Sequence, residues 1–481
     1  MYRYFRFSFI VFILIVFFTF NSNAQITWNS KADSCNFFSS PRAVDLNKDK
    51  VLDIVIGGGI EYVKSQSGVL AFDGETGKLL WRTPSRSQVY TAALFQDVNA
   101  DSIPDVFIGG RDAVFFCING KTGEKIWEFW ADSLPNPFNN SWYNFFGCQF
   151  TKDLDKDGFK DLLVTNSGNY LALPTEKNRP TGKILILSSK TGKVLKNSSF
   201  NETKESYYAP HTFIDEKKHE ILLYGSGGET VGGTLRAIPL QKFISSDLKT
   251  NKLLLRDTVK GFIINSITAD FTGDKLTDLF VTRMNGSVEV FSYKTKKSVW
   301  KKGFPSYEAY VTPSLAYFNA DKIPDVFTIF AKGQFPNYSS FKQVVFDGKT
   351  GAILYEANEG FNQFSPGVSL DMNGDKLDEI LFIENQVDFE AKQITWRVKK
   401  IDPVTKTASY LTEKMNYCSM AASPLIVDLD GDGNLELIVA VTSIDMISDA
   451  VSKSEVHVIP LNSKGKITWN GYLGSKENGR F

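Results

Sequence analysis

One acidic pattern recurs along this chain and constrains its fold more than any other feature. Its clearest copy runs from Asp428 to Glu436, with acidic side chains at positions 1, 3, 5 and 9 and a glycine at position 6. A run rich in β-branched residues, Leu437 to Val441, follows directly. Oxygen ligands at alternating positions around a sharp turn suit Ca²⁺. The pattern therefore predicts a calcium loop inside a β-hairpin.

Related segments begin near residues 45, 97, 153, 215, 270, 317, 371 and 428. The shortest step, from 270 to 317, is 47 residues, and the longest, from 153 to 215, is 62 residues. Self-similarity at such a period indicates a repeat architecture, and β-rich repeats of this length are typical of propeller blades. Two copies are degenerate, because the loop at Asp215 is shortened and Tyr317 replaces the first ligand.

A second signature, a hairpin with a Thr-Gly turn, follows most of the acidic loops. The copies, from clearest to weakest, are Ala71–Trp81, Ile118–Trp127, Leu187–Leu195, Phe346–Tyr355, Ser292–Trp300 and Asn462–Trp469. Each predicts two strands joined by a tight turn. Strand A then enters the acidic A–B loop, strand B leaves it, and strands C and D flank the C–D turn. The sequence predicts an all-β, eight-bladed β-propeller over residues 25–481, with four antiparallel strands per blade. A seven-bladed ring with an insertion is the alternative, because Asp215 lacks a working loop.

A propeller ring must close or leave open sheet edges. The segments Ile26–Asn29 and Ile467–Asn470 are nearly identical and both match a strand D. The N-terminal segment can therefore complete the last blade. Cys35 and Cys418 each stand ten residues before the acidic loop of the first and last repeats. A disulfide that latches the ring is one hypothesis, and free buried thiols are the other.

Residues 1–24 have the pattern of a secretory signal peptide. Arg3 and Arg6 precede an apolar run of 14 residues from Phe7 to Phe20, and small residues then predict cleavage before Gln25. No second long apolar segment follows, so we expect an exported mature chain without a transmembrane segment, located outside the cell, at its surface or in the periplasm. Basic and acidic residues both number 54, which gives no charge argument for a nucleic-acid partner.

The acidic loops, each followed by a strand and often by glycines, resemble FG-GAP/VCBS repeats, as in integrin-type α-chain propellers. The A-x-D-G-x-T-G-K-x-x-W hairpins are similar to those of PQQ-type quinoprotein propellers. Together the two motif sets cover essentially all of residues 26–481. The first resemblance implies several structural Ca²⁺ sites. The expected ligands are Asp45, Asn47, Asp49, Asp53, Asp97, Asn99, Asp101, Asp105, Asp153, Asp155, Asp157, Asp161, Asp270, Thr272, Asp274, Asp278, Asp371, Asn373, Asp375, Glu379, Asp428, Asp430, Asp432 and Glu436.

The sequence offers no clear catalytic constellation. The adjacent-cysteine pair and haem motif of PQQ dehydrogenases are absent, so PQQ is not an expected cofactor. His211 can face the ring axis, but a hydrogen-bonded turn histidine is the alternative. The predicted function is a calcium-stabilised binding or adhesion module. Two enzymatic alternatives stay open: a propeller acting on polysaccharide, as a lyase does, or a PQQ-dependent dehydrogenase-like protein.

Antiparallel alternation places the acidic loops and C–D turns on one face of the ring and the D–A and B–C connections on the other. The D–A segments are rich in aromatic residues, which suit glycan stacking or anchoring of a protein partner. Trp142, Tyr143, Tyr207, Tyr208 and Tyr307 are the candidate ligand-binding residues, because polar residues surround them. Other aromatics of these segments include Tyr90, Phe146 and Tyr310, whereas Phe145, Phe262 and Phe364 are expected to pack between strands.

Overall fold

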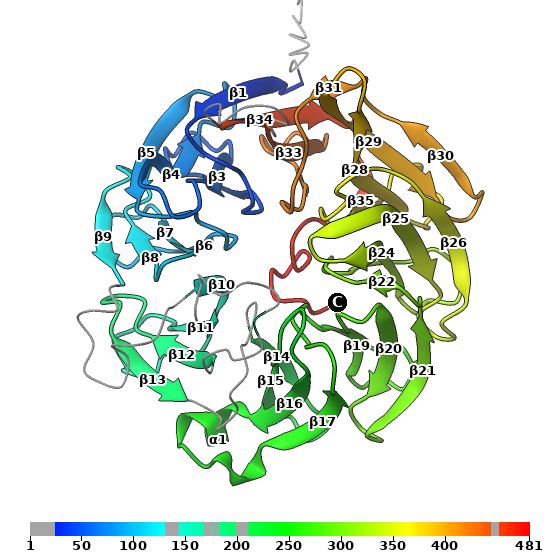
Figure 1. Cartoon of the computed structure of the whole chain (residues 1–481). Helices are drawn as coiled ribbons and strands as arrows, with labels where there is room; N and C mark the ends of the chain where they lie inside the picture. The colour runs from blue at the N-terminus through cyan, green and yellow to red at the C-terminus, as the bar shows by residue number, and fades with distance from the viewer. Residues whose placement is uncertain (1–24, 130–143, 168–175, 177–181, 199–209, 444–451) are drawn as a thin grey trace, which may run out of the picture.

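The acidic loops and C–D turns join antiparallel strands into eight sheets arranged around one axis (Figure 1). The structure is a computed structural model that describes residues 25–129, 144–167, 176, 182–198, 210–443 and 452–481. The predicted signal peptide lies outside these residues. Each sheet has at least four strands, with strand A nearest the axis and strand D at the perimeter. The eight-bladed propeller is therefore confirmed.

The first four blades follow one another in chain order. Their strands are β2 (Arg42–Val44), β3 (Asp53–Gly57), β4 (Ser65–Phe72) and β5 (Leu79–Ser85); β6 (Leu94–Gln96), β7 (Asp105–Gly109), β8 (Phe115–Ile118) and β9 (Lys125–Glu128); β10 (Asn144–Phe150), β11 (Leu162–Ser167), β12 (Lys183–Leu187) and β13 (Val194–Ser198); and β14 (His211–Ile214), β15 (Glu220–Gly225), β16 (Gly233–Pro239) and β17 (Lys252–Asp257).

The other four blades continue the series. Their strands are β18 (Ile267–Ala269), β19 (Asp278–Thr282), β20 (Ser287–Ser292) and β21 (Lys297–Gly303); β23 (Ser314–Ala316), β24 (Asp325–Gln334), β25 (Asn337–Phe346) and β26 (Ile353–Asn358), with β22 (Tyr307–Glu308) also on β24; β27 (Val368–Asp371), β28 (Glu379–Asp388), β29 (Gln393–Asp402) and β30 (Thr407–Tyr410), with β31 (Met415–Asn416) also on β29; and β32 (Leu425–Val427), β33 (Glu436–Thr442), β34 (Lys453–Pro460) and β1 (Trp28–Asp33).

Blade 4 decides between eight blades and seven. Although the loop at Asp215 is short, β14 and β15 still pair in register from His211↔Leu223 to Ile214↔Glu220. A short helix, α1 (Leu240–Ile244), and a 3₁₀ turn, η3 (Leu248–Thr250), lie between β16 and β17. The blade survives because a strand pair needs its apolar alternation and a tight turn, and does not need the acidic ligands of that turn.

The first strand of the described chain closes the ring. Strand β1 pairs antiparallel with β34, from Trp28↔Val458 to Asp33↔Lys453, and so becomes strand D of blade 8. This confirms the predicted closure. The expectation that Ile467–Asn470 also forms a strand D is wrong, since β1 already occupies that edge. Its strand, β35 (Lys466–Trp469), pairs with β27 on the inner side of blade 7.

Residues 470–481, here called the axial segment, continue from β35 into the centre of the ring (Figure 1). Arg42 of blade 1 donates from Nη2 to the carbonyl oxygen of Tyr472 at 2.7 Å. In blade 5, the amide of Thr268 donates to the carbonyl oxygen of Gly479 at 2.9 Å. The axial segment therefore connects inner strands on different sides of the ring and fills part of its channel.

The four cysteines, Cys35, Cys117, Cys148 and Cys418, are free and buried thiols. The Cys35–Cys418 disulfide is not formed. Burial raises the pKa of the Cys35 and Cys418 thiols to about 12, which keeps both protonated and unreactive at neutral pH.

Across the described ranges, no helix is long and apolar enough to cross a bilayer.

Candidate functional site

A buried carboxylate at position 9 organises each acidic loop. Asp53 is fully buried and accepts hydrogen bonds from the amides of Leu46 at 2.8 Å and Gly74 at 3.0 Å. The first amide belongs to the A–B loop and the second to the C–D turn of the same blade. Burial raises the pKa of Asp53 to about 6. Asp105 and Asp325 make the same pair of contacts, so in these blades position 9 ties together the two turns that the sequence repeats, whether or not it also binds a cation.

The first carboxylate of each loop shapes its backbone. Asp45 accepts from the amide of Lys48 at 2.7 Å and from that of Lys50 at 3.2 Å. Asp428 does the same for Gly431 and Gly433. These are turn hydrogen bonds that need no metal ion. A bound cation would share the carboxylate oxygens with these amides.

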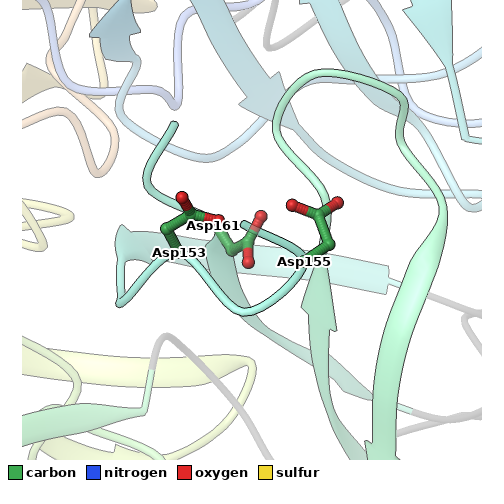
Figure 2. Close-up of side chains that lie close together, drawn as sticks. All are labelled: Asp153, Asp155 and Asp161. Atoms are coloured by element: carbon green, nitrogen blue, oxygen red, sulfur yellow. The ribbon is translucent and has the colours of Figure 1, made fainter. Parts of the chain in front are cut away.

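Three loops bring three carboxylates close together. The carboxylate oxygens lie within 4.8 Å of one another in each set, and the sets are Asp153, Asp155 and Asp161 (Figure 2); Asp270, Asp274 and Asp278; and Asp428, Asp430 and Asp432. The loops that begin at Asp45, Asp97 and Asp371 have asparagine at position 3, so their donor set mixes carboxylate and amide oxygens. Both kinds of oxygen are normal calcium ligands. The donor chemistry fits Ca²⁺, most strongly in the three clustered loops.

The opposite face of the ring carries a cavity of about 480 Å³, here called the axial pocket. Its lining residues come from D–A and B–C connections, which places it away from the acidic loops. Phe38, Tyr90 and Phe146 form one aromatic wall, with ring centroids 5.7 Å and 5.6 Å apart in that order. Tyr472 of the axial segment also lines the pocket. The axial segment thus contributes to the pocket lining.

A second aromatic wall comes from blades 5 to 7, across the axis from the first. The ring of Tyr310 lies 5.9 Å from those of Phe335 and Phe364. All three residues line the axial pocket. Phe364 therefore does more than the packing that the sequence analysis assigned to it, whereas Phe145 and Phe262 are buried as expected. Two groups of aromatic rings, from different sides of the ring of blades, thus line one pocket.

Arg111 is the principal polar group of the pocket. Its guanidinium is ion-paired with Glu61, and its Nε donates to the Tyr90 hydroxyl at 3.0 Å. The guanidinium carbon lies 5.3 Å from the Tyr90 ring centroid and 5.8 Å from that of Phe146. Burial raises the pKa of Tyr90, so its hydroxyl keeps its proton and donates to Glu61 at 3.2 Å. Arg111 is thus held in place by charge and by ring contacts together.

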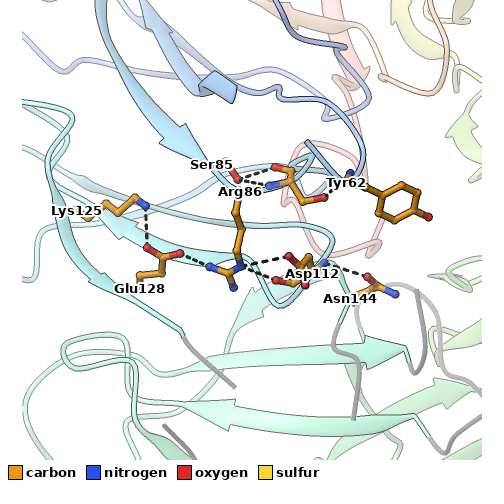
Figure 3. A network of polar contacts seen from close by, with 8 residues as sticks. Tyr62, Ser85, Arg86, Asp112, Lys125, Glu128 and Asn144 are labelled. Atoms are coloured by element: carbon orange, nitrogen blue, oxygen red, sulfur yellow. Dashed lines mark hydrogen bonds and ion pairs between the residues drawn. The ribbon is translucent and has the colours of Figure 1, made fainter. Parts of the chain in front are cut away.

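A polar network between blades 1 and 2 supports the connection that carries Arg111 (Figure 3). Arg86 is ion-paired with Glu128, which also accepts from Lys125 at 2.8 Å. The same arginine donates from Nε to the carbonyl oxygen of Asp112 at 2.8 Å. The amide of Asp112 in turn donates to Asn144 of blade 3 at 3.3 Å. These contacts fix the residue next to Arg111 from two neighbouring blades.

Of the five candidate ligand-binding residues, Tyr307 alone falls within the described residues. Trp142, Tyr143, Tyr207 and Tyr208 lie outside the described residues. Tyr307 is half-buried in β22, with its ring 6.1 Å from that of Phe304, and it does not line the axial pocket.

Sequence reasoning missed Glu61 and Arg111, although a signal was present. Arg111 directly follows Gly109-Gly110, and Glu61 comes two residues after Gly57-Gly58-Gly59. Both charges thus stand just beyond the glycines that end strand B. In consecutive blades these positions are neighbours on the pocket face.

His211 does face the axis, but inside the fold. It begins β14, is buried, and its Nε2 lies 3.0 Å from Thr268 Oγ1. The axial segment covers it, since a Cβ at Gly479 would lie 3.1 Å from the imidazole. Burial, together with the nearby Arg480 guanidinium, lowers the pKa of His211 to about 3. It is a neutral, hydrogen-bonded core histidine that is only 3% exposed among the described residues.

The fold is similar to those of solved dehydrogenases at low sequence identity. Quinohemoprotein alcohol dehydrogenase ADHIIG from Pseudomonas putida HK5 aligns with a TM-score of 0.57 and 13% identity, over 91% of this chain and 76% of its own. The quinohemoprotein alcohol dehydrogenase from Comamonas testosteroni gives 0.56 and 12%, over 90% and 76%. A europium-containing methanol dehydrogenase gives 0.55 and 11%, over 94% and 86%. Such identities establish a shared propeller fold and no shared activity.

No curated protein matches this sequence. A family model does match: the FAM234A/B beta-propeller covers residues 28–372, well over half of the chain. The match begins at the first residue of β1 and ends just beyond β27. This match supports a propeller fold. The resemblance of the acidic loops to FG-GAP/VCBS repeats stays a prediction. The chain belongs to the FAM234A/B beta-propeller family.

Proposed function

We propose that this protein is an exported binding module that takes the end of a glycan chain into the axial pocket and has no catalytic activity. The observation that carries the proposal is the pocket itself: a cavity of about 480 Å³ lined by the two aromatic walls, by Tyr472 and by the Arg111–Glu61 pair. Small-molecule sites are cavities of this size, largely apolar, with a few placed polar groups.

The arrangement of the walls favours a sugar over a protein side chain as the group that is bound. Sugar rings have apolar faces and a polar rim, and aromatic side chains combine a flat apolar face with low conformational cost. Here aromatic residues from both groups line the pocket, and Gln88 and Asn36 are also in the lining. Export, inferred from residues 1–24, would bring the pocket to extracellular or cell-surface glycans.

Catalysis on polysaccharide is the alternative, and the chemistry of the pocket supports it less well. A general base must reach a substrate proton while a second group stabilises the developing charge. Glu61 is committed to Arg111, and His211 is covered by the axial segment. Glu229 is a further carboxylate in the described lining, and the other one, Glu61, is the partner of Arg111.

The pocket also does not fit a PQQ-like quinone. Such a cofactor is a multiply charged anion, and the described lining contains one cation, Arg111, which Glu61 already neutralises. The axial segment lies in the channel beside it. We therefore assign no redox step to this chain.

The acidic loops have a separate role in this proposal. Ca²⁺ bound at several of them would stabilise the ring, because each loop gathers like charges that repel one another without a cation. The three clusters of carboxylates support this role, and so does their position on the face opposite the pocket. Calcium would then act on stability and leave the chemistry of the pocket unchanged.

A glycan array probed with the mature chain in Ca²⁺ tests the proposed function. We expect the wild type to bind a set of glycans that share a terminal sugar, and the Tyr310→Ala/Phe364→Ala variant to lose that binding. Phe389→Ala is the matched control, because Phe389 is an exposed aromatic residue outside the pocket lining. Trp142→Ala/Tyr143→Ala tests the sequence-based expectation in parallel. If the Tyr310→Ala/Phe364→Ala variant bound the same glycans as the wild type, the proposal would be contradicted. Binding of proteins but of no glycan would contradict it as well.

A further inference from the structure

Arg111 and Glu61 present a donor and an acceptor side by side on the pocket wall. The Nε group of Arg111 is engaged by Tyr90 and Glu61, whereas its two Nη groups have no hydrogen-bond partner among the described residues. The Arg111 side chain is 23% exposed and lines the axial pocket. A guanidinium has five N–H donors in a rigid fork, so two directions remain for a ligand.

Glu61 supplies the complementary acceptor. Its side chain is 37% exposed, and one oxygen, Oε1, is ion-paired with Arg111 and accepts a hydrogen bond from the Tyr90 hydroxyl. An ionised carboxylate has about four lone-pair directions, so it can accept further hydrogen bonds. Neighbouring sugar hydroxyls each donate one hydrogen bond and accept others. The Arg111 guanidinium can therefore donate to one sugar hydroxyl while the Glu61 carboxylate accepts from the hydroxyl next to it.

We propose that the axial pocket selects an uncharged sugar ring, whose adjacent hydroxyls bind Arg111 and Glu61 while its apolar face lies on an aromatic wall. This inference rests on the proposed glycan-binding function and adds the class of sugar. The Arg86–Glu128–Asp112 contacts hold the Arg111 connection between blades, so the fork is in place before a ligand arrives. A preordered site loses less entropy when it binds.

The charges of the pocket exclude acidic sugars. The positive charge of Arg111 is already balanced by Glu61, with which it is ion-paired. A ligand carboxylate would lie beside the Glu61 carboxylate in a partly desolvated pocket, and like charges at short range are unfavourable there. Glu229 adds a second carboxylate to the lining. Hexuronic and sialic acids should therefore bind more weakly than neutral hexoses of the same ring geometry.

Saturation-transfer NMR and calorimetry with the mature chain test this selection. The probes are the methyl glycosides of glucose, galactose and mannose, each compared with the methyl glycoside of its uronic acid. We expect at least one neutral probe to bind, and its uronic acid to bind at least about tenfold more weakly. Arg111→Lys and Glu61→Gln should each weaken the neutral probe about tenfold, the typical effect of one lost charged hydrogen bond.

Arg82→Lys and Glu75→Gln are matched controls, since both residues are exposed and lie outside the pocket lining. Tyr90→Phe is a second test that keeps the wall intact. It removes the hydroxyl that orients Arg111 and should also weaken the neutral probe. Melting curves must match the wild type before affinities are compared.

The outcomes separate the two proposals. If glycans bind but uronic acids bind as well as neutral sugars, or if Arg111→Lys and Glu61→Gln bind like the wild type, the selection proposed here is wrong and the glycan-binding function stands. If no probe and no arrayed glycan binds the folded wild type, the proposed function itself fails.

Discussion

The indole Nε1 of Trp81 donates a 2.7 Å hydrogen bond to the carbonyl oxygen of Gly120 in the next blade. The same ring covers the following turn, where a Cβ at Gly123 would lie 2.8 Å from the indole and φ is +75°. Only glycine combines that close approach with that backbone conformation at little cost. The Thr-Gly turn and the terminal tryptophan of the repeated hairpin are thus two halves of one contact between blades. The pairs Trp28–Gly77, Trp127–Gly192 and Trp300–Gly351 repeat the contact.

Trp81→Ala should destabilise the propeller by about 3–5 kcal/mol, the usual effect of deleting a large buried aromatic side chain. Trp81→Phe keeps much of the packing and loses the hydrogen bond, so it should cost less. Urea denaturation measures both. Leu80→Ala, at the neighbouring exposed position, should change the free energy of unfolding little. A Trp81→Ala variant as stable as wild type would show that this contact does not hold adjacent blades together.

His211 should make the protein sensitive to acid. Its pKa is about 3 in the folded chain against 6.5 for the free side chain, so the unfolded chain binds more protons between these values. The stability that the neutral form provides is present above pH 6.5 and is lost as the pH falls towards 3. The slope attributable to one such group is at most about 1.4 kcal/mol per pH unit.

Free energies of unfolding measured from pH 7 to pH 4 should therefore fall less steeply for His211→Gln than for the wild type. His219→Gln is the control, because the His219 side chain is 59% exposed. Parallel pH profiles for wild type and His211→Gln would mean that His211 is not held neutral beneath the axial segment.

Removal of calcium should lower the melting temperature. A site filled at a hundred times its dissociation constant stabilises the fold by about 2.7 kcal/mol, so several sites together should give a large shift under EDTA that added Ca²⁺ reverses. Asp155→Asn, in one of the three clusters, should reduce the shift, whereas Glu390→Gln, at an exposed hairpin, should not. An unchanged melting curve in saturating chelator would rule out structural calcium.

The cysteines should behave as four buried thiols. Titration with a thiol reagent without reductant should label none of them in the native protein and all four after denaturation. Burial both excludes the reagent and raises the pKa of the Cys148 thiol to about 12, as it does for Cys35 and Cys418. Two thiols instead of four in denaturant would restore the Cys35–Cys418 disulfide hypothesis.

The repeated motifs were enough to predict the ring. The acidic loop and the Thr-Gly hairpin alternate along most of the sequence, so the strand order of most blades follows from local pattern. At Asp215, where the ligands are gone, a seven-bladed ring stayed possible until the pairing of β14 with β15 was seen. The position of β35 could not be predicted in this way. Its sequence matches β1, but β1 takes the edge of β34 and β35 pairs with β27, a difference that the local sequence does not encode.

The pocket was harder to foresee, because its residues meet only after the ring closes. Glu61 and Arg111 are 50 positions apart, and each follows glycines that read as turns. Tyr90, Phe146 and Tyr310 belong to the aromatic connections that the sequence marked, and these do line the pocket. Tyr307 packs inward instead, since flanking polar residues do not reveal the orientation of a side chain in a short strand.

Hydrogen–deuterium exchange with and without a glycan identified on the array tests most directly whether the axial pocket is the binding site. We expect protection in peptides that contain residues 36–40, 88–92 and 111, which come from three connections of the pocket face. The acidic loops at residues 153–161 and 428–436 should exchange unchanged when Ca²⁺ is held constant. Protection confined to those loops or to the outer strands, with none in the pocket peptides, would show that the axial pocket is not the binding site.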